Sequence, residues 1–319
     1  MRLLEAIRGG SPQALARGIT LVEDGGSGAE AIVRACYPRA RTGVVVGVTG
    51  PPGVGKSTLV SGIAGMFRRQ GSRVAIFAVD PSSAFSGGAI LGDRVRMHAH
   101  AGDPGVFIRS MASRGHPGGL ARATADAVEL AAAGGWDPIL IETLGAGQDE
   151  IEIAALADAV LVVLMPGQGD DIQAIKAGLL EIADLFVINK ADLPGADRLE
   201  QELLHTAPAG AGGAPAPPAI LRTVAVRGEG VEALAGAIRR HLEAPAGGGE
   251  RRLRRAEHRL LSGLRDRFLA EIVERARADG CWAGIVRDLA ERRIDPYAAV
   301  ERVWGRRRGE DSGGAGGER

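Results

Sequence analysis

The stretch VVVGVTGPPGVGKSTLV, at residues 44–60, decides the fold class of this chain. Residues 44–48 form a short apolar run of the kind that makes a strand buried on both faces. Residues 50–57 fit the pattern G-x-x-x-x-G-K-S, whose glycines let successive backbone N–H groups face an anion at the start of a helix. The sequence therefore predicts a phosphate-binding loop between a strand and a helix.

Two side chains of this loop suit a nucleoside triphosphate and its magnesium ion. Lys56 would reach the β- and γ-phosphates, and the hydroxyl of Ser57 would bind Mg²⁺, a hard cation that takes oxygen ligands. We expect the loop and the first turn of the helix to contact the nucleotide through Gly50, Pro51, Pro52, Gly53, Val54, Gly55, Lys56, Ser57 and Thr58.

Short apolar runs recur after this loop, separated by stretches long enough for a helix. They lie at residues 74–79, 139–141, 159–164, 185–188 and 220–224. Such alternation predicts an α/β fold of the P-loop NTPase type, with a doubly wound and mostly parallel sheet. Ligands of such sheets lie beyond the carboxyl ends of the strands.

Acidic residues follow two of the predicted strands. Asp80 comes after the run at 74–79 and Glu142 after the run at 139–141, so both carboxylates would enter the crevice of the phosphate loop and are candidates for the metal shell. Glu142 and Gly145 have the spacing by which a carboxylate and a glycine N–H sense a γ-phosphate. Gln148, farther along, is the candidate for positioning the attacking water.

The segment Asn189-Lys190-Ala191-Asp192, after the run at 185–188, indicates which base is bound. The Asp192 carboxylate can accept from both N1–H and the exocyclic amine of guanine, whereas adenine offers no such donor pair, so the sequence favours GTP over ATP. Asn189 would position the loop and contact the base, and the stem of Lys190 would pack over the ring. Farther on, Val224-Ala225 stands where GTPases commonly carry Ser-Ala, which leaves the Ala225 backbone as a further base contact.

Helices are expected at both ends of the chain. We expect a helical extension at 1–40, the P-loop domain at 41–243, a C-terminal helical arm at 250–307 and a disordered tail at 308–319. In the arm, Leu260, Leu264, Phe268 and Ile272 recur at every fourth position. This stripe fits either packing on its own domain or an arm for dimerisation or partner binding.

Composition argues against several classes of partner. Lys and Arg together number 39, as do Asp and Glu, so no general field would attract nucleic acid or an anionic membrane. No apolar run approaches the roughly 20 residues of a membrane-spanning helix. Cys36 and Cys281 lie far apart and form no zinc-type cluster. We therefore expect a cytoplasmic protein without nucleic-acid or membrane partners.

Further motifs give the chain a close resemblance to the MeaB/ArgK-type GTPases, a SIMIBI-class family that includes the human MMAA protein. Besides the phosphate loop, the resemblance lies in residues 80–83 (DPSS), 92–97 (GDRVRM), 107–111 (FIRSM), 142–148 (ETLGAGQ) and 166–178 (PGQGDDIQAIKAG). The last segment is not needed for nucleotide binding, and it contains Lys176, one of only three lysines in the chain.

The resemblance implies a GTPase that hydrolyses GTP to GDP and phosphate slowly until a partner stimulates it. It implies a G-protein chaperone that gates loading, protection or reactivation of adenosylcobalamin on an acyl-CoA mutase, chiefly methylmalonyl-CoA mutase, and no cobalamin bound by the chaperone itself. It also implies a homodimer formed through the C-terminal helices. Asp80, Asp93 and Glu142 resemble the metal and switch carboxylates, while Asp170, Gln173 and Lys176 resemble the segment that couples nucleotide to mutase.

Three alternatives stay open at this stage. A metallocentre-assembly GTPase would need metal ligands, for which His98, His100 and His116 are the nearest candidates. An ArgK-type kinase linked to arginine/ornithine transport is opposed by the guanine motif and by the lack of a His-Arg-Asp catalytic pattern. A binding module could also hold GTP without turnover.

Overall fold

A computed structural model describes residues 2–39, 43–80, 100, 102–112, 119–143, 155–167, 182–206, 218–243 and 248–305. The chain divides into two compact units, Met1–His258 and Arg259–Arg319. The first unit contains the sheet and the predicted nucleotide motifs.

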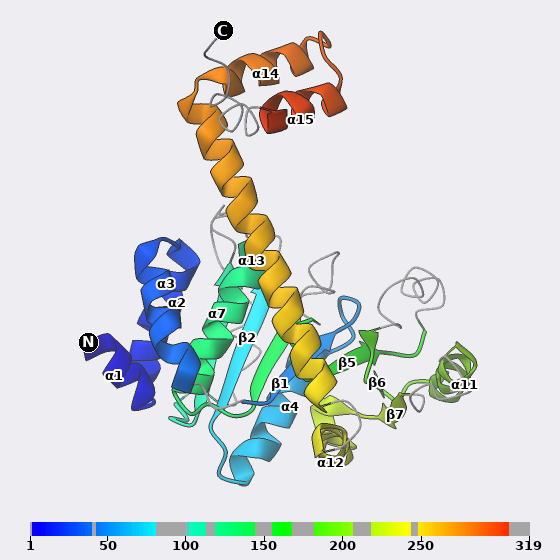
Figure 1. Ribbon diagram of the computed structural model, residues 1–319. Helices are drawn as coiled ribbons and strands as arrows, with labels where there is room; N and C mark the ends of the chain where they lie inside the picture. The colour runs from blue at the N-terminus through cyan, green and yellow to red at the C-terminus, as the bar shows by residue number, and fades with distance from the viewer. Residues whose placement is uncertain are drawn as a thin grey trace, which may run out of the picture. The chain divides into compact units, whose positions relative to one another are not determined.

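The first unit is built on a seven-stranded sheet with the strand order β3-β2-β4-β1-β5-β6-β7 (Figure 1). Every neighbouring pair is parallel, which confirms the predicted α/β fold of the doubly wound type. The strands are β1 (Val45–Thr49), β2 (Val74–Asp80), β3 (Val106–Ala112), β4 (Ile139–Thr143), β5 (Ala159–Leu164), β6 (Leu185–Ile188) and β7 (Ala219–Arg222).

The central strands are apolar because helices cover both of their faces. All residues of β1, β4, β5 and β6 are buried, which explains why these strands read as continuous apolar runs without alternation. Successive side chains of a strand point to opposite faces of the sheet, so Val45 and Val46 of β1 belong to different hydrophobic clusters, one on each face.

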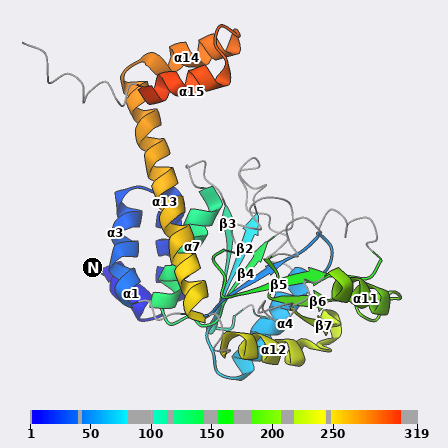
Figure 2. The same cartoon turned by 45° about the vertical axis from the view of Figure 1, so that its right-hand side comes forward.

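Helices cover both faces of the sheet (Figure 2). On the first face, α4 (Lys56–Arg69) and α12 (Val231–Glu243) bury Leu59, Ile63, Leu234 and Ile238 against β1, β4 and β5. On the second face lie α2 (Pro12–Asp24), α3 (Ser27–Cys36), α7 (Gly119–Ala133) and α11 (Ala196–Thr206). The helices cover the faces of the sheet, whereas the connecting loops lie at the carboxyl ends of the strands.

The helices expected near the N-terminus are present and belong to the core of the sheet. The segment contains α1 (Arg2–Arg8), α2, α3 and a short 3-10 turn, η1 (Tyr37–Arg39). Ser11 caps α2, since its hydroxyl accepts from the backbone N–H of Ala14 at 3.3 Å. Leu15 and Ile19 are fully buried in one cluster with Trp136 and with residues of β2 and β4.

Strand β3, at the edge of the sheet, was not predicted. Its centre carries Arg109, and a charged residue in the middle of a strand hides the apolar pattern. The charge is accommodated because Arg109 Nη2 lies 2.6 Å from Glu23 Oε2 of α2, whose carboxylate is buried. With β3 included, the run at 139–141 belongs to the fourth strand along the chain, β4. The last strand ends at Arg222, two residues before the predicted Val224.

The second unit contains most of α13 (Gly248–Ala278), with α14 (Cys281–Ala290) and α15 (Pro296–Gly305). Helix α15 begins at Pro296, and the Asp295 carboxylate caps it by accepting from the N–H groups of Tyr297 and Ala298 at 2.9 and 3.0 Å. The start of α13 belongs to the first unit, where Arg255 Nη1 lies 2.7 Å from Asp158 Oδ1. Among the helices of the described ranges, none is both long and apolar enough to cross a membrane.

Candidate functional site

The phosphate loop joins the end of β1 to the start of α4, and two of its glycines are sterically required. Gly50 has φ 141°, and a Cβ there would lie 2.1 Å from the carbonyl oxygen of Val163 in β5. Gly55 has φ 94°, and a Cβ there would lie 2.6 Å from Asn189 Nδ2. Any side chain at either position would push the loop away from β5 or from the base motif. The phosphate loop therefore packs closely against β5 and against the base motif at Asn189.

Lys56 opens helix α4, and its side chain is buried beside the loop. Its ammonium nitrogen donates to the carbonyl oxygens of Gly50 and Pro51 at 2.7 and 2.8 Å. This places a positive charge next to the N-terminal end of α4, where the helix dipole adds to it. The arrangement is suited to phosphate.

Ser57 and Glu142 meet where β1 and β4 end. The two strands are paired with Val48 opposite Glu142, which brings the Glu142 side chain to the start of α4. Ser57 Oγ donates to Glu142 Oε1 at 2.6 Å, and both side chains are buried. A hydroxyl and a carboxylate are oxygen ligands of the kind that Mg²⁺ binds, so these residues fit the predicted metal role.

Asp80 reaches the same edge of the sheet from β2. It is the last residue of that strand, and Val79 lies opposite Thr143 of β4, one residue beyond Glu142. In the described part of the chain, no group of three or more His, Cys, Asp and Glu side chains could hold a metal ion. A magnesium ion would take its further ligands from phosphate, water or other parts of the chain. The predicted residues Asp93, Gly145, Gln148, Asp170, Gln173 and Lys176 lie outside the described residues.

Asn189 connects the base motif to the phosphate loop. Its buried side chain donates through Nδ2 to the carbonyl oxygen of Val54 at 2.8 Å. Its Oδ1 accepts from Thr223 Oγ1 at 3.0 Å and from the backbone N–H of Ala225 at 3.1 Å. Asn189 therefore holds three loops together, a role that the motif alone did not fully indicate.

Lys190 makes a second link between the two motifs. It has φ 54°, a left-handed conformation that is uncommon for a side-chain-bearing residue. Its ammonium nitrogen donates to the carbonyl oxygen of Gly53 at 2.8 Å. The strained turn thus directs the Lys190 side chain along the phosphate loop.

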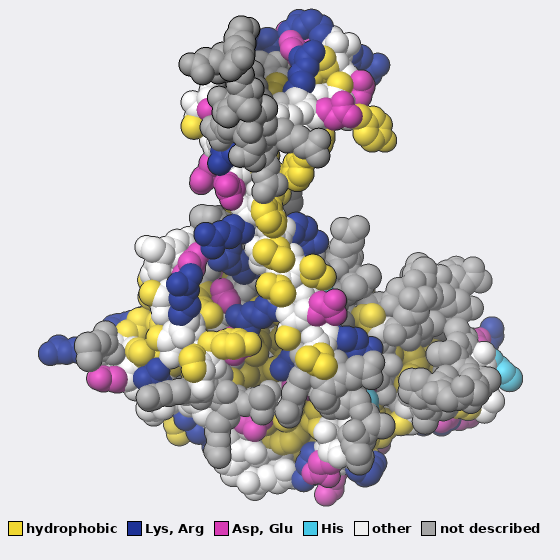
Figure 3. Space-filling view, in the orientation of Figure 1, with side chains coloured by type: hydrophobic (Ala, Val, Ile, Leu, Met, Phe, Trp, Pro, Cys, Tyr) yellow, Lys and Arg dark blue, Asp and Glu magenta, His cyan; other side chains and the backbone are white. Residues whose placement is uncertain are grey.

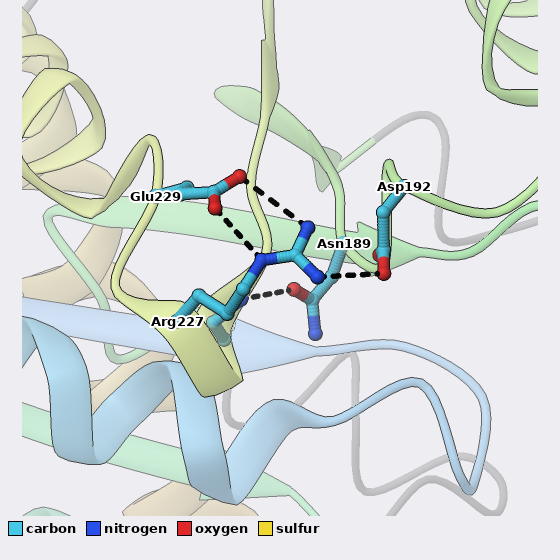
Figure 4. Close-up of polar contacts among 5 residues, drawn as sticks. Asn189, Asp192, Arg227 and Glu229 are labelled. Carbon is cyan, nitrogen blue, oxygen red and sulfur yellow. Dashed lines mark hydrogen bonds and ion pairs between the residues drawn. The ribbon is translucent and has the colours of Figure 1, made fainter.

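Asp192 contacts a residue that the sequence reasoning did not single out. Arg227 Nη1 lies 3.2 Å from Asp192 Oδ2, while Arg227 Nε donates to Glu229 Oε1 at 2.7 Å (Figure 4). The hydrogen bond with Glu229 raises the pKa of Arg227 above its ordinary value. The sequence signal available was the charged pair in Arg227-Gly228-Glu229, directly after Val224-Ala225.

Comparison with known proteins assigns this site to a family. Residues 15–279 match the family described as "Methylmalonyl Co-A mutase-associated GTPase MeaB". The chain belongs to the MeaB family. A putative GTPase of Pyrococcus abyssi is 44% identical over 94% of this chain and 94% of its own length. GTPase ArgK of Escherichia coli is 41% identical over 59% of this chain and 58% of its own length.

A solved structure shares the fold of this MeaB-family chain. The structure described as "LAO/AO transport system kinase" superposes with a TM-score of 0.68, covering 95% of this chain and 96% of its own, at 23% identity. The family match and the named relatives establish this MeaB-family protein as a GTPase, which confirms the predicted resemblance and enzyme class.

Of the three histidines considered as metal ligands, His100 lies in the described part of the chain. His100 Nε2 lies 3.1 Å from Ser61 Oγ of α4. His98 and His116 lie outside the described residues.

Proposed function

We propose that this MeaB-family GTPase gates adenosylcobalamin loading, protection or reactivation on an acyl-CoA mutase, chiefly methylmalonyl-CoA mutase. The observation that carries the proposal is the extent of the family match, from residue 15 to residue 279. This range includes most of α2 and reaches beyond the end of α13, well outside the elements that bind nucleotide. The extent of the match supports the mutase-associated function of the family in addition to GTP binding. In this account the protein works in the cytoplasm and binds no cobalamin itself.

The nucleotide cycle in this proposal uses the residues at the carboxyl ends of β1, β2 and β4. Lys56 would hold the β- and γ-phosphates, and the site residues Ser57, Asp80, Asp93 and Glu142 would hold Mg²⁺. When bound, the ion would supply positive charge that stabilises the phosphate oxygens during transfer to water. Gly145 senses the γ-phosphate, and Gln148 positions the attacking water. Slow turnover in the absence of the partner is expected, because in this account further positioning groups come from the partner in trans.

Guanine recognition rests on the loops that follow β6 and β7. Asp192 accepts from N1–H and the exocyclic amine, Asn189 and the Ala225 backbone approach the base edge, and Lys190 packs along the ring. The contacts Asn189 to Val54 and Lys190 to Gly53 support this proposal, since they tie base recognition to the phosphate loop. Binding of the base thereby helps to fix the loop that holds the phosphates.

Coupling to the mutase is assigned to Asp170, Gln173 and Lys176. A loop whose lysine is ordered by the γ-phosphate and released after hydrolysis can report the nucleotide state to a partner. We expect the protein to bind the methylmalonyl-CoA mutase of its own organism with different affinities in a non-hydrolysable GTP analogue and in GDP. Size-exclusion chromatography of the two proteins in each nucleotide tests this. No complex in either state would contradict the proposal.

The C-terminal arm is assigned to homodimer formation. Hydrophobic side chains gather along α13 (Figure 3). Within the apolar stripe of this helix, the side chains of Leu260, Leu264 and Phe268 are 63%, 42% and 44% exposed. An exposed apolar stripe of this kind is more stable when a second copy covers it.

Replacing Leu264 and Phe268 by glutamine should convert a dimer into a monomer while GTP binding persists, because the nucleotide motifs belong to the other compact unit. Sedimentation velocity measures the change. The exposed Arg265 and Arg267 of the same helix, both changed to glutamine, provide the control and should leave the dimer intact. A wild-type protein that sediments as a monomer at micromolar concentration would contradict the assignment.

A further inference from the structure

Asp192 carries more acceptor capacity than a guanine base can use. A carboxylate has about four lone-pair positions, and the N1–H and exocyclic amine of guanine would occupy two of them. When the base excludes water, the remaining positions need other donors, since an unsatisfied buried carboxylate is unfavourable. The side chain of Val224, where other GTPases commonly carry a serine, offers no hydrogen-bond donor.

Arg227, in the same loop as Val224, supplies a hydrogen-bond donor to Asp192. Its Nη1 lies 3.2 Å from Asp192 Oδ2, so only one of the two carboxylate oxygens takes the contact. Each carboxylate oxygen can accept more than one hydrogen bond, and the contact therefore leaves the carboxylate able to accept from the base. The interaction is charge-assisted, since it joins a guanidinium to a carboxylate, and at 3.2 Å it is longer than most contacts of this kind.

Glu229 fixes the other side of the guanidinium. Arg227 Nε donates to Glu229 Oε1 at 2.7 Å, and Nη2 lies 3.5 Å from Glu229 Oε2 (Figure 4). The planar guanidinium is therefore held between two carboxylates, by two contacts with Glu229 and one with Asp192. A freely rotating arginine could not define the direction in which Asp192 points.

The backbone between residues 222 and 230 holds this pair in place. Arg227 ends the 3-10 turn η3 (Ala225–Arg227), and Gly228 follows with φ 73°. The N–H of Val224 donates to the carbonyl oxygen of Glu229 at 3.0 Å, which closes the turn. At Gly230, a Cβ would lie 2.1 Å from the carbonyl oxygen of Arg222, so this position admits only glycine.

We propose that Arg227, held by Glu229, is a positioning residue that orients the Asp192 carboxylate for guanine in place of the donor that Val224 cannot provide. This inference rests on the proposed role of Asp192 in reading the base. Arg227 itself reads no base atom in this account, and its effect passes through Asp192. A variant should therefore lose guanine discrimination together with affinity, whereas phosphate binding is retained.

The test measures the dissociation constants of GDP and IDP, because inosine lacks the exocyclic amine that Asp192 accepts. In the Arg227→Ala variant we expect GDP binding about tenfold weaker and IDP binding weakened less, because hypoxanthine keeps N1–H but lacks the exocyclic amine, so that the preference for GDP over IDP is reduced. Arg227→Lys should recover only part of the preference, since a single ammonium cannot hold two carboxylates in a fixed plane. The Arg198→Ala variant, which removes an exposed arginine paired with Glu202 in α11, serves as the control and should match wild type.

Glu229→Ala provides a second, independent arm. If Glu229 acts through Arg227, the Arg227→Ala/Glu229→Ala double variant should bind GDP no more weakly than Arg227→Ala alone. Unchanged GDP and IDP affinities in Arg227→Ala would overturn the proposal, and so would tighter GDP binding, which would make Arg227 a competitor of the base. A wild-type protein that prefers ADP to GDP would instead contradict guanine recognition itself. Equal thermal unfolding midpoints of the variants exclude a loss of folding.

Discussion

In a Lys56→Ala variant, GTP hydrolysis under single-turnover conditions should fall by roughly a hundredfold or more, the usual loss when one preorganised transition-state donor is removed. The physical reason is the position of the ammonium group. Gly50 and Pro51 hold it with hydrogen bonds of 2.7 and 2.8 Å, beside the start of α4. Charge that develops on the phosphate oxygens would then meet a fixed cation, with no reorganisation needed during the reaction.

Two controls separate this effect from a folding defect. Arg69→Ala removes a cation from the far end of the same helix and should keep wild-type hydrolysis. Lys56→Met retains most of the apolar stem, so it should fold like wild type and still lose activity. Hydrolysis within threefold of wild type in both Lys56 variants would remove this lysine from the proposed mechanism.

An Asp192→Asn variant should shift the nucleotide preference from GTP toward XTP. Asparagine cannot accept two hydrogen bonds from N1–H and the exocyclic amine of guanine, but its oxygen and its amide can pair with N1–H and the C2 carbonyl of xanthine. Each charge-assisted hydrogen bond is worth about 1.5–3 kcal/mol, so the ratio of GTP to XTP affinity should change by at least about a hundredfold. Competition binding against a fluorescent guanine nucleotide measures the ratio.

The substitution is nearly isosteric, which keeps the loop intact. Asp197→Asn makes the same chemical change at an exposed residue of α11 and should leave the ratio unaltered. If Asp192→Asn kept the wild-type preference for GTP, the base would have to be read by other groups, and the role assigned to Arg227 would fail with it.

The sequence predicted those features best whose structure depends on a short, continuous stretch of residues. Buried parallel strands need apolar residues on both faces, so β1, β5 and β6 were visible as continuous runs. The phosphate loop was predictable because its backbone conformation excludes side chains, as the close contact at Gly50 shows. The family resemblance drawn from these motifs was confirmed.

Features that depend on contacts between distant segments could not be predicted. Strand β3 was missed because Arg109 interrupts its apolar pattern, and only the buried Glu23 of α2 explains the charge. The contact of Arg227 with Asp192 joins residues 35 positions apart, on loops that follow different strands. A local pattern holds no information about such a pairing unless the strand order is known.

The measurement that tests the account most directly is GTP hydrolysis by the purified protein, alone and with the adenosylcobalamin-dependent methylmalonyl-CoA mutase of its own organism. ATP serves as the control nucleotide, and Lys176→Ala as the coupling variant. The account predicts slow hydrolysis of GTP, none of ATP, a clear acceleration by the mutase, and a weaker acceleration in Lys176→Ala. A GTPase rate that the mutase leaves unchanged, with guanine selectivity intact, would contradict the chaperone function and leave a GTPase whose partner is another protein.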